Sequence, residues 1–331
     1  MRFTIALLGL FIIPTVWAHT YIDSHAHLFD FFQQSEGVEA LIEAMDEGNI
    51  EKSVVMGIPV AKKWHEDEPQ KPRFYAGDDA PVYWYSATDF LVHDLVSKAK
   101  PADQARLIPF LSGFNPNDKN AATQIRQLLA MHPDFWQGIG EVFARHDDIT
   151  ALTLGETPRI NNEAMMRVYK VAAEYDLPVL LHTNITSKRE RKALYEEELR
   201  EVLQANKKVR FIWAHAGTSM EIHRHQEKLV FLPRLLDELL AEYKNLYIDL
   251  SWVVLEPYML DGKGIPSKEW LALLNKYPTR FVLGSDVVGR FKSQAEIMQA
   301  FSPVLDALPA TVARKISKEN MLALLPRKKR Q

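Results

Sequence analysis

Two histidines stand one residue apart in the apolar stretch YIDSHAHLF, residues 21–29. A β-strand points alternate side chains to opposite faces, so a strand here would project His25 and His27 in the same direction. Neutral imidazole is the commonest metal ligand among side chains. The spacing therefore indicates two ligands for one divalent cation at the end of a strand.

Polar side chains also end four other apolar, β-rich runs. They are Glu141 in QGIGEV, His182 in PVLLHTN, His215 in RFIWAHAG and Asp286 in RFVLGSD. Burying several ionisable groups together is costly unless something compensates them, and a divalent cation does so. The chain has no cysteine, so nitrogen and oxygen must supply every ligand. This donor set predicts a divalent metal, with Zn²⁺ as first choice and manganese or iron as alternatives.

Each of these residues has a simpler interpretation when it is taken alone. A lone buried histidine is more often a hydrogen-bonded core residue, Asp286 could cap a following helix, and Glu141 could pair with Arg145. The joint interpretation is favoured because the same placement at a strand end recurs in one consistent order.

Eight short β-rich runs recur along the chain, and most are nearly continuous in apolar residues. The runs are 21–28, 53–59, 107–114, 136–142, 179–184, 209–217, 246–252 and 281–286. Continuous apolar runs are typical of parallel strands covered on both faces, and helical patterns lie between them. Eight such units predict an α/β fold, a (β/α)8 TIM barrel, as a single domain over residues 19–331. An open doubly wound sheet is the alternative, but the Gly-rich phosphate turn after its first strand is missing.

Local signals place some of the helices and loops. Asn161 and Asn162 precede an apolar helical face as cap candidates, and Ser293 with Glu296 fits a capping box. The long connections 60–87, 143–160 and 253–266 follow the second, fourth and seventh runs. In a TIM barrel these βα loops lie on the catalytic face, so we expect lids over a pocket, with surface decoration as the alternative.

The first 18 residues, MRFTIALLGLFIIPTVWA, resemble a secretory signal peptide, with Arg2 before an apolar stretch and Ala18 at the expected cleavage point. A membrane anchor is less favoured because the apolar stretch is shorter than the ~20 residues that span a bilayer. We therefore expect an exported protein, periplasmic in a Gram-negative bacterium, without a stable membrane anchor after cleavage. The formal net charge of −3 argues against nucleic-acid partners and leaves a small-molecule substrate. The sequence does not indicate an oligomeric state.

The ordered set Asp23-Ser24-His25-Ala26-His27, Gly140-Glu141, His182, His215 and Gly284-Ser285-Asp286 resembles the amidohydrolase superfamily of TIM-barrel, metal-dependent hydrolases. The resemblance covers nearly the whole mature chain and is strongest to the amidohydrolase-related branch, which also contains decarboxylases. The resemblance implies that His25, His27, His182 and Asp286 bind metal, with one or two ions present.

The same resemblance suggests roles for the remaining site residues. Asp286 would accept the proton of the metal-bound water, and His215 would bind a second metal or polarise the substrate. Glu141 stands where many members have a carboxylated lysine, and it would bridge two ions if two are present.

Further side chains are candidates for contacts with the substrate. Arg145, Asn184, Ser251 and Arg290 follow the strand ends and could bind it, although a solvated ion pair is an equal alternative for each arginine. Trp213 precedes His215 by two residues, so it would either wall the pocket or fill an ordinary barrel layer.

Three functions fit this set of residues. The first is hydrolysis of a C–N, C–O or lactone bond of a small molecule by a metal-activated water. The second is non-oxidative decarboxylation of a small carboxylic acid, and the third is an exported barrel that binds metal or ligand without turnover. The polar residues at so many strand ends argue against the third.

Overall fold

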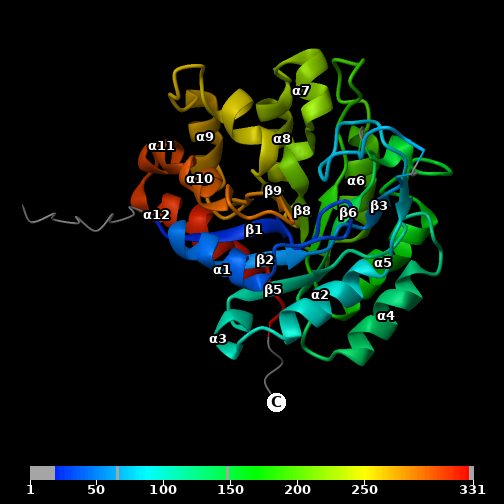
Figure 1. The fold of residues 1–331 in the computed structure, drawn as a ribbon. Helices are drawn as coiled ribbons and strands as arrows, with labels where there is room; N and C mark the ends of the chain where they lie inside the picture. The colour runs from blue at the N-terminus through cyan, green and yellow to red at the C-terminus, as the bar shows by residue number, and fades with distance from the viewer. Residues whose placement is uncertain (1–18, 65–66, 147–148, 328–331) are drawn as a thin grey trace, which may run out of the picture.

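The computed structural model describes residues 19–64, 67–146 and 149–327. The predicted signal peptide, residues 1–18, lies outside the described residues. Within them the chain folds around one barrel of parallel strands with helices outside it (Figure 1).

Eight strand positions build the barrel, and every neighbouring pair in it is parallel. The strands are β1 (Tyr21–His27), β2 (Ile50–Met56), β5 (Leu107–Leu111), β6 (Gly138–Phe143), β7 (Val179–His182), β8 (Phe211–Trp213), β9 (Leu246–Asp249) and the pair β10 (Phe281–Val282) and β11 (Val287–Val288). All eight predicted runs are confirmed, with differences of a few residues at their ends.

The eighth position is split in two, and its two parts close the sheet. β10 pairs with β9, whereas β11 pairs with β1. Between them the Ser24 amide donates to the Leu283 carbonyl at 2.8 Å, and the Asp286 amide donates to the His25 carbonyl at 2.7 Å. The sheet is therefore closed, and the predicted single-domain (β/α)8 TIM barrel is confirmed over the open sheet.

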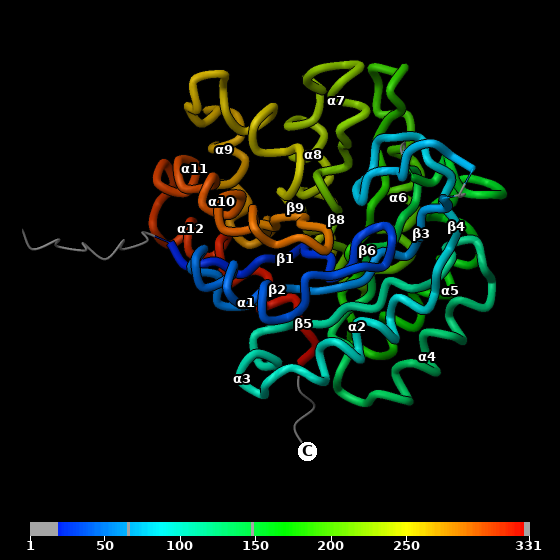
Figure 2. The backbone as a smooth tube through the Cα atoms, viewed as in Figure 1, coloured from blue at the N-terminus to red at the C-terminus, as the bar shows by residue number. Residues whose placement is uncertain are grey.

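Helices and short turns fill the connections, and the backbone can be followed through them in Figure 2. The helices are α1 (Val38–Glu47), α2 (Thr88–Ser97), α3 (Pro101–Gln104), α4 (Ala121–Met131), α5 (Glu163–Glu174), α6 (Glu196–Ala205), α7 (Met220–Gln226), α8 (Leu232–Glu242), α9 (Lys268–Lys276), α10 (Gln294–Gln299), α11 (Ser302–Asp306), α12 (Ala310–Arg314) and α13 (Asn320–Leu324). Shorter helical turns are Thr150–Leu152, Ala214–Gly217, Trp252–Val254, Leu255–Met259 and Lys315–Glu319.

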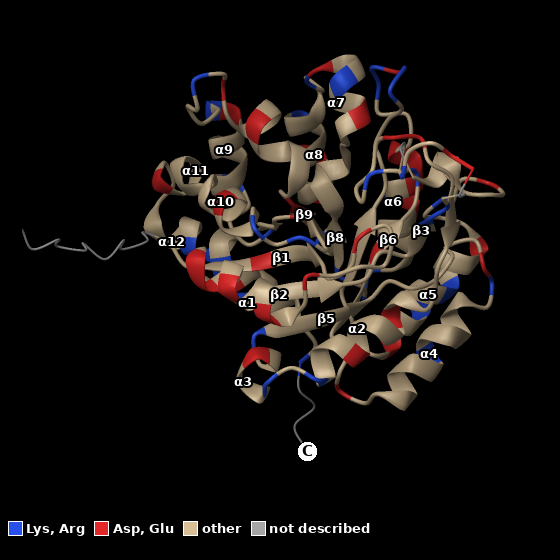
Figure 3. Cartoon of the chain, in the orientation of Figure 1, with Lys and Arg blue, Asp and Glu red and all other residues tan. Residues whose placement is uncertain are grey.

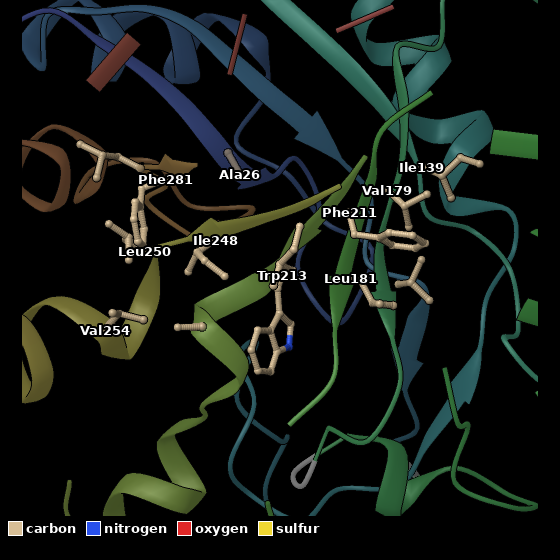
Figure 4. Close-up of a cluster of buried hydrophobic side chains, with 14 of the residues drawn as sticks. Ala26, Ile139, Val179, Leu181, Phe211, Trp213, Ile248, Leu250, Val254 and Phe281 are labelled. Carbon is tan, nitrogen blue, oxygen red and sulfur yellow. The ribbon is translucent and has the colours of Figure 1, made fainter. Parts of the chain in front are cut away.

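The core has two layers. Outward-facing strand residues pack against the helices, and Figure 4 shows part of this layer with Leu181, Trp213 and Ile248. The inner layer fills the barrel and includes Val54, Phe110, Ile212, Val282 and, from α13, Met321. Because Arg210, just before β8, donates to the Leu324 carbonyl at 3.0 Å, α13 covers the end of the barrel where the strands begin. The opposite end is left for the site.

The predicted caps have different outcomes. Asn162 caps α5, since its side chain accepts a hydrogen bond from the Met165 amide at 2.8 Å. Ser293 precedes α10, but its side chain caps no amide there, so the predicted capping box with Glu296 is wrong. The backbone of Ser293 is already helical, at φ −90° and ψ −5°, whereas a capping side chain needs an extended residue.

The first long connection folds back on itself. It contains the antiparallel pair β3 (Val60–Lys62) and β4 (Val82–Trp84). The ammonium of Lys62 lies inside this connection, where it donates to the Arg73 carbonyl at 3.0 Å, to Asp78 at 2.6 Å and to the Tyr75 carbonyl. Lys62 thereby holds residues 73–78 against the end of β3.

Basic and acidic residues are interspersed along the helices and loops around the barrel (Figure 3). The described part of the chain contains no helix that is both long and apolar enough to cross a membrane.

Asn162→Ala should lower the free energy of unfolding by about 1–2 kcal/mol, because the Met165 amide loses its cap and two further side-chain hydrogen bonds to residues 116 and 117 disappear. Asn161→Ala is the matched control, since that side chain only reaches Glu201 at the surface, and it should change stability by less than about 0.5 kcal/mol. Urea unfolding of both variants measures the difference. Equal effects would contradict the assigned cap.

Candidate metal centre

The residues predicted as metal ligands converge at the mouth where the strands end. They are His25 and His27 of β1, Glu141 of β6, His182 of β7, His215 after β8 and Asp286 between β10 and β11. Their side chains are almost fully buried, and Asp286 is the most exposed at 9%. Five strand positions, far apart in the sequence, thus deliver one cluster.

Four donor atoms form the tightest part of this cluster. His25 Nε2 lies 3.3 Å from His27 Nε2, 3.2 Å from Glu141 Oε2 and 3.4 Å from Asp286 Oδ1. His27 Nε2 lies 3.2 Å from Glu141 Oε2 and 3.4 Å from Asp286 Oδ1. Four ligands around Zn²⁺ at about 2.0–2.1 Å stand about 3.3–3.4 Å apart in a tetrahedron. The four atoms therefore fit a single zinc-sized cation.

Hydrogen bonds on the far side of both rings set the direction of their lone pairs. His27 Nδ1 lies 3.1 Å from the Gly57 carbonyl, which can only accept, so Nδ1 carries the proton. His25 Nδ1 lies 2.8 Å from Asp249 Oδ2 and donates in the same way. In the neutral rings both Nε2 lone pairs then point into the cluster, as ligands must.

The cluster attracts positive charge. Burial alone would lower the pKa of His25, but Glu141 and Asp286 raise it well above its ordinary value. The two carboxylates therefore favour a positive charge among the donors. A divalent cation would compensate the carboxylates without protonating a ligand.

Glu141 joins this group of donors to a second one. Its Oε1 lies 2.8 Å from His182 Nδ1 and 3.3 Å from His215 Nε2, whereas Oε2 faces the β1 histidines. Burial alone would raise the pKa of Glu141, but His25 and His182 hold it well below its ordinary value. A carboxylate with one oxygen in each group is able to bridge two cations.

Asp249, at the end of β9, was not among the predicted site residues. It is fully buried, and besides His25 it accepts from Ser251, through the hydroxyl at 2.5 Å and the amide at 3.1 Å. Burial would raise the pKa of Asp249, but the hydrogen bond from His25 lowers it, so the residue stays a carboxylate. The sequence carried a usable signal, because this aspartate ends an apolar run as Asp286 does.

The turn after β8 breaks the strand alternation. His215 has φ 53° and Ala216 has φ 51°, a left-handed backbone that non-glycine residues seldom adopt. Trp213 therefore packs in the outer core layer, where its Nε1 donates to the Thr183 carbonyl at 2.9 Å, while His215 faces the cluster. Both predicted positions for Trp213 are therefore wrong, because its side chain faces the helices and neither lines the pocket nor fills the barrel interior. Trp252, which was not among the predicted site residues, lies beside His215 instead, with ring centroids 5.0 Å apart.

A pocket opens above the cluster. The residues lining it are His27, Phe31, Ile58, Tyr75, Ala76, Glu141, Phe143, His146, His215, Trp252, Asp286 and Val288. Tyr75 and Ala76 come from the connection 60–87, and Phe143 and His146 from the range 143–160. Two of the three long connections thus reach the pocket, as lids would, whereas 253–266 contributes no lining residue among those described.

His146, three residues after β6, is one of the residues that line the pocket. Its ring stacks on His182 with centroids 4.1 Å apart, and its Nδ1 is buried without a hydrogen-bond partner among the described residues. Burial, and after it the neighbouring His182, lowers the pKa of His146 well below its ordinary value. The ring is therefore neutral.

The predicted substrate contacts lie elsewhere. Arg145 pairs with Glu198, with Nε 2.9 Å from Oε2, and Arg290 pairs with Asp30 at 3.0 Å. The Oδ1 atom of Asn184 lies 3.3 Å from His182 Nε2. Ser251 contacts Asp249 and His215, with its Oγ 2.8 Å from His215 Nδ1. None of the predicted contacts is a lining residue of the pocket described above, so direct substrate binding by them stays a prediction.

Fold and site together define a TIM-barrel protein with a candidate metal centre at the carboxyl ends of its strands. The chain belongs to the amidohydrolase family, since the sequence model of that family, described as Amidohydrolase, matches residues 22–327. No curated protein matches the sequence.

Solved structures share the fold. An amidohydrolase from Burkholderia multivorans with bound zinc has a TM-score of 0.58 at 14% identity, over 93% of this chain and 100% of that one. A probable 2-pyrone-4,6-dicarboxylic acid hydrolase from Acinetobacter baumannii, with citric acid bound, has a TM-score of 0.51 at 14% identity, over 92% and 99%. A 2,6-dihydroxybenzoate decarboxylase from Rhizobium has a TM-score of 0.52 at 13% identity, over 92% and 98%. At these identities the likeness shows the fold and not the reaction.

His25→Ala should weaken zinc binding more than about a hundredfold, because it removes one of the four donors. Asp249→Asn should weaken it by about 10–100-fold, because it loosens the His25 ring without removing a donor. Zinc titration with a competing chelator measures both affinities. His225 is an exposed histidine of α7, and the control variant His225→Ala should leave the zinc affinity unchanged. Unchanged zinc affinity in His25→Ala would refute the assigned ligand.

Proposed function

We propose that the protein is a metal-dependent hydrolase that cleaves a C–N, C–O or lactone bond of a small molecule. The observation that carries this proposal is the placement of Asp286, which belongs to the four-donor cluster and also lines the pocket. His25, His27, Glu141 and Asp286 would hold the first cation, and Glu141, His182 and His215 offer a place for a second. Zn²⁺ is our choice of metal, because the donor spacing fits its tetrahedral geometry.

A bound cation of this kind supplies Lewis acidity and lowers the pKa of water towards ~7. The residues supply the rest of the chemistry. Asp286 has one oxygen in the cluster and the other 3.9 Å from His215 Nε2, at the floor of the pocket. It is placed to accept a proton from the attacking water and to return that proton to the leaving group.

The hydrogen bonds around Ser251 favour a ligand role for His215. The Ser251 hydroxyl donates its single proton to Asp249 at 2.5 Å, so it accepts from His215 Nδ1 at 2.8 Å. The lone pair of a neutral His215 is then on Nε2, which faces Glu141 Oε1 at 3.3 Å. In this state His215 would bind a cation through Nε2 and could not donate a hydrogen bond to a developing oxyanion.

Export of the protein is also proposed, and it is supported by the signal-like pattern of residues 1–18. N-terminal sequencing of the protein from its native host should begin at His19. A start at Met1 would contradict export by cleavage.

Asp286→Asn should lower kcat by about 10²–10⁴-fold, because the amide cannot accept the proton of the attacking water. The variant should still bind zinc, since three donors and the amide oxygen remain. Zinc-loaded wild type and variant are compared on a panel of lactones, amides, esters and aromatic acids, with assays for hydrolytic product and for carbon dioxide. Asp94→Asn, on the exposed side of α2, is the control.

Hydrolysis by the wild type with loss in Asp286→Asn would support the proposal. Carbon dioxide release without any hydrolytic product would overturn it in favour of a decarboxylase.

A further inference from the structure

The walls of the pocket differ sharply from its floor. The floor carries the ionisable residues of the cluster, whereas the walls are mostly apolar or aromatic. The wall residues are Phe31, Ile58, Tyr75, Ala76, Phe143, His146, Trp252 and Val288. The empty space of the pocket is about 310 Å³, and this includes open solvent at the mouth. The lining residues, and not the volume, therefore indicate what the pocket binds.

No lysine or arginine is among the described residues that line the pocket. Recognition of a substrate carboxylate normally uses such a side chain, and arginine above all because its planar fork matches the carboxylate. The stretches at 65–66 and 147–148, which the structure does not describe, are His-Glu and Asp-Asp in sequence, so they bring no lysine or arginine either.

The cations nearest to the walls already have partners. Lys62 lies 5.7 Å from the centre of the Phe31 ring, but its ammonium is bound by Asp78 and by backbone carbonyls. Arg290 lies over Phe74, next in sequence to Tyr75, and pairs with Asp30 at 3.0 Å. If Lys62 or Arg290 turned towards a ligand, Asp78 or Asp30 would lose its ion-pair partner, which costs free energy.

The charge of the floor also disfavours an anion. Glu141 and Asp286 line the floor, and the fully buried Asp249 lies behind it against His25. With only the first divalent cation bound, these three carboxylates retain one negative charge, which disfavours an anionic group in the pocket.

We propose that the substrates are uncharged compounds with a flat apolar ring, such as neutral aryl esters, aryl lactones or anilides. This inference rests on the proposed hydrolase function. The ring would lie between the aromatic walls, and the bond to be cleaved would face Asp286.

His146 is the one imidazole of the wall outside the cluster. It is 6% exposed, and its Nδ1 has no hydrogen-bond partner among the described residues. The imidazole of His146 can therefore exchange a hydrogen bond with a polar atom of a bound compound, such as a carbonyl or ether oxygen.

Matched pairs of compounds test the inference on the zinc-loaded protein. Phenyl acetate and 4-acetoxybenzoate contain the same ester and differ by one carboxylate, and kcat/KM should be at least tenfold higher for the neutral member. A preference for the carboxylated member, or equal values, would overturn the inference.

A binding measurement separates this inference from the proposed function. Acetanilide and 4-acetamidobenzoate form a second matched pair, and calorimetry should show at least tenfold tighter binding of acetanilide. If acetanilide binds but no ester, lactone or amide is hydrolysed, the hydrolase proposal fails and the assigned ligand class survives. If neither compound binds at millimolar concentration, or the anion binds better, the inference is wrong.

A charge added to the wall should reverse the preference. Ala76→Lys places an ammonium at the pocket, and the ratio of kcat/KM for 4-acetoxybenzoate over phenyl acetate should rise at least tenfold. Ala80→Lys is the matched control, because Ala80 is equally buried in the same connection and does not line the pocket. An equal rise in both variants would mean that the wall does not set the preference. Thermal unfolding checks that both variants fold. If either variant does not fold, the matched pairs of compounds measured on the wild-type protein still test the inference.

Discussion

The structure depends on one electrostatic constraint, which is that several buried donors point their lone pairs at a single place. The Nε2 atoms of the two β1 histidines lie 3.3 Å from each other and 3.2–3.4 Å from one carboxylate oxygen each of Glu141 and Asp286. In the neutral rings no hydrogen atom lies between these four atoms. Such an arrangement is repulsive in the neutral-ring, ionised-carboxylate state, and a divalent cation removes the repulsion. The barrel brings the donors together because the carboxyl ends of its parallel strands all meet at one mouth.

Buried hydrogen bonds hold the donors in position. Asp23 accepts from the amides of His25 and Ser285 at 3.0 and 2.9 Å, and from Gln294 at 2.8 Å. It therefore ties β1 to the segment that carries Asp286. The Gly57 carbonyl that orients His27 also accepts from the Ser112 hydroxyl at 2.9 Å. These contacts fix the ring positions before any cation binds, which is the usual arrangement around protein metal sites.

Much of the fold and of the cluster could be predicted because both follow from short-range patterns. Apolar runs ending in His, Glu or Asp mark buried parallel strands, and the geometry of the barrel then brings their ends together. Asp249 carried the same pattern and was still missed, since the sequence does not show that its partner is His25, 224 residues away. Arg145 was placed near the substrate for a related reason, because its pairing with Glu198 spans 53 residues.

Backbone conformation limited the prediction elsewhere. The positions of Trp213 and Trp252 depend on left-handed backbone at His215 and at Trp252 itself, where φ is 53° and 54°. Neither residue is a glycine, the residue type that usually adopts this conformation, so the sequence does not indicate a left-handed turn at either position. The same turns place an aromatic wall beside the metal ligands, and it is this wall that makes the pocket apolar.

Anomalous diffraction at the zinc edge, from crystals of the zinc-loaded protein, tests the central claim most directly. We predict a zinc ion within about 2.0–2.2 Å of His25 Nε2, His27 Nε2 and Asp286, at the mouth of the barrel. Zinc found only at surface histidines, with the β1 rings free of metal, would contradict it.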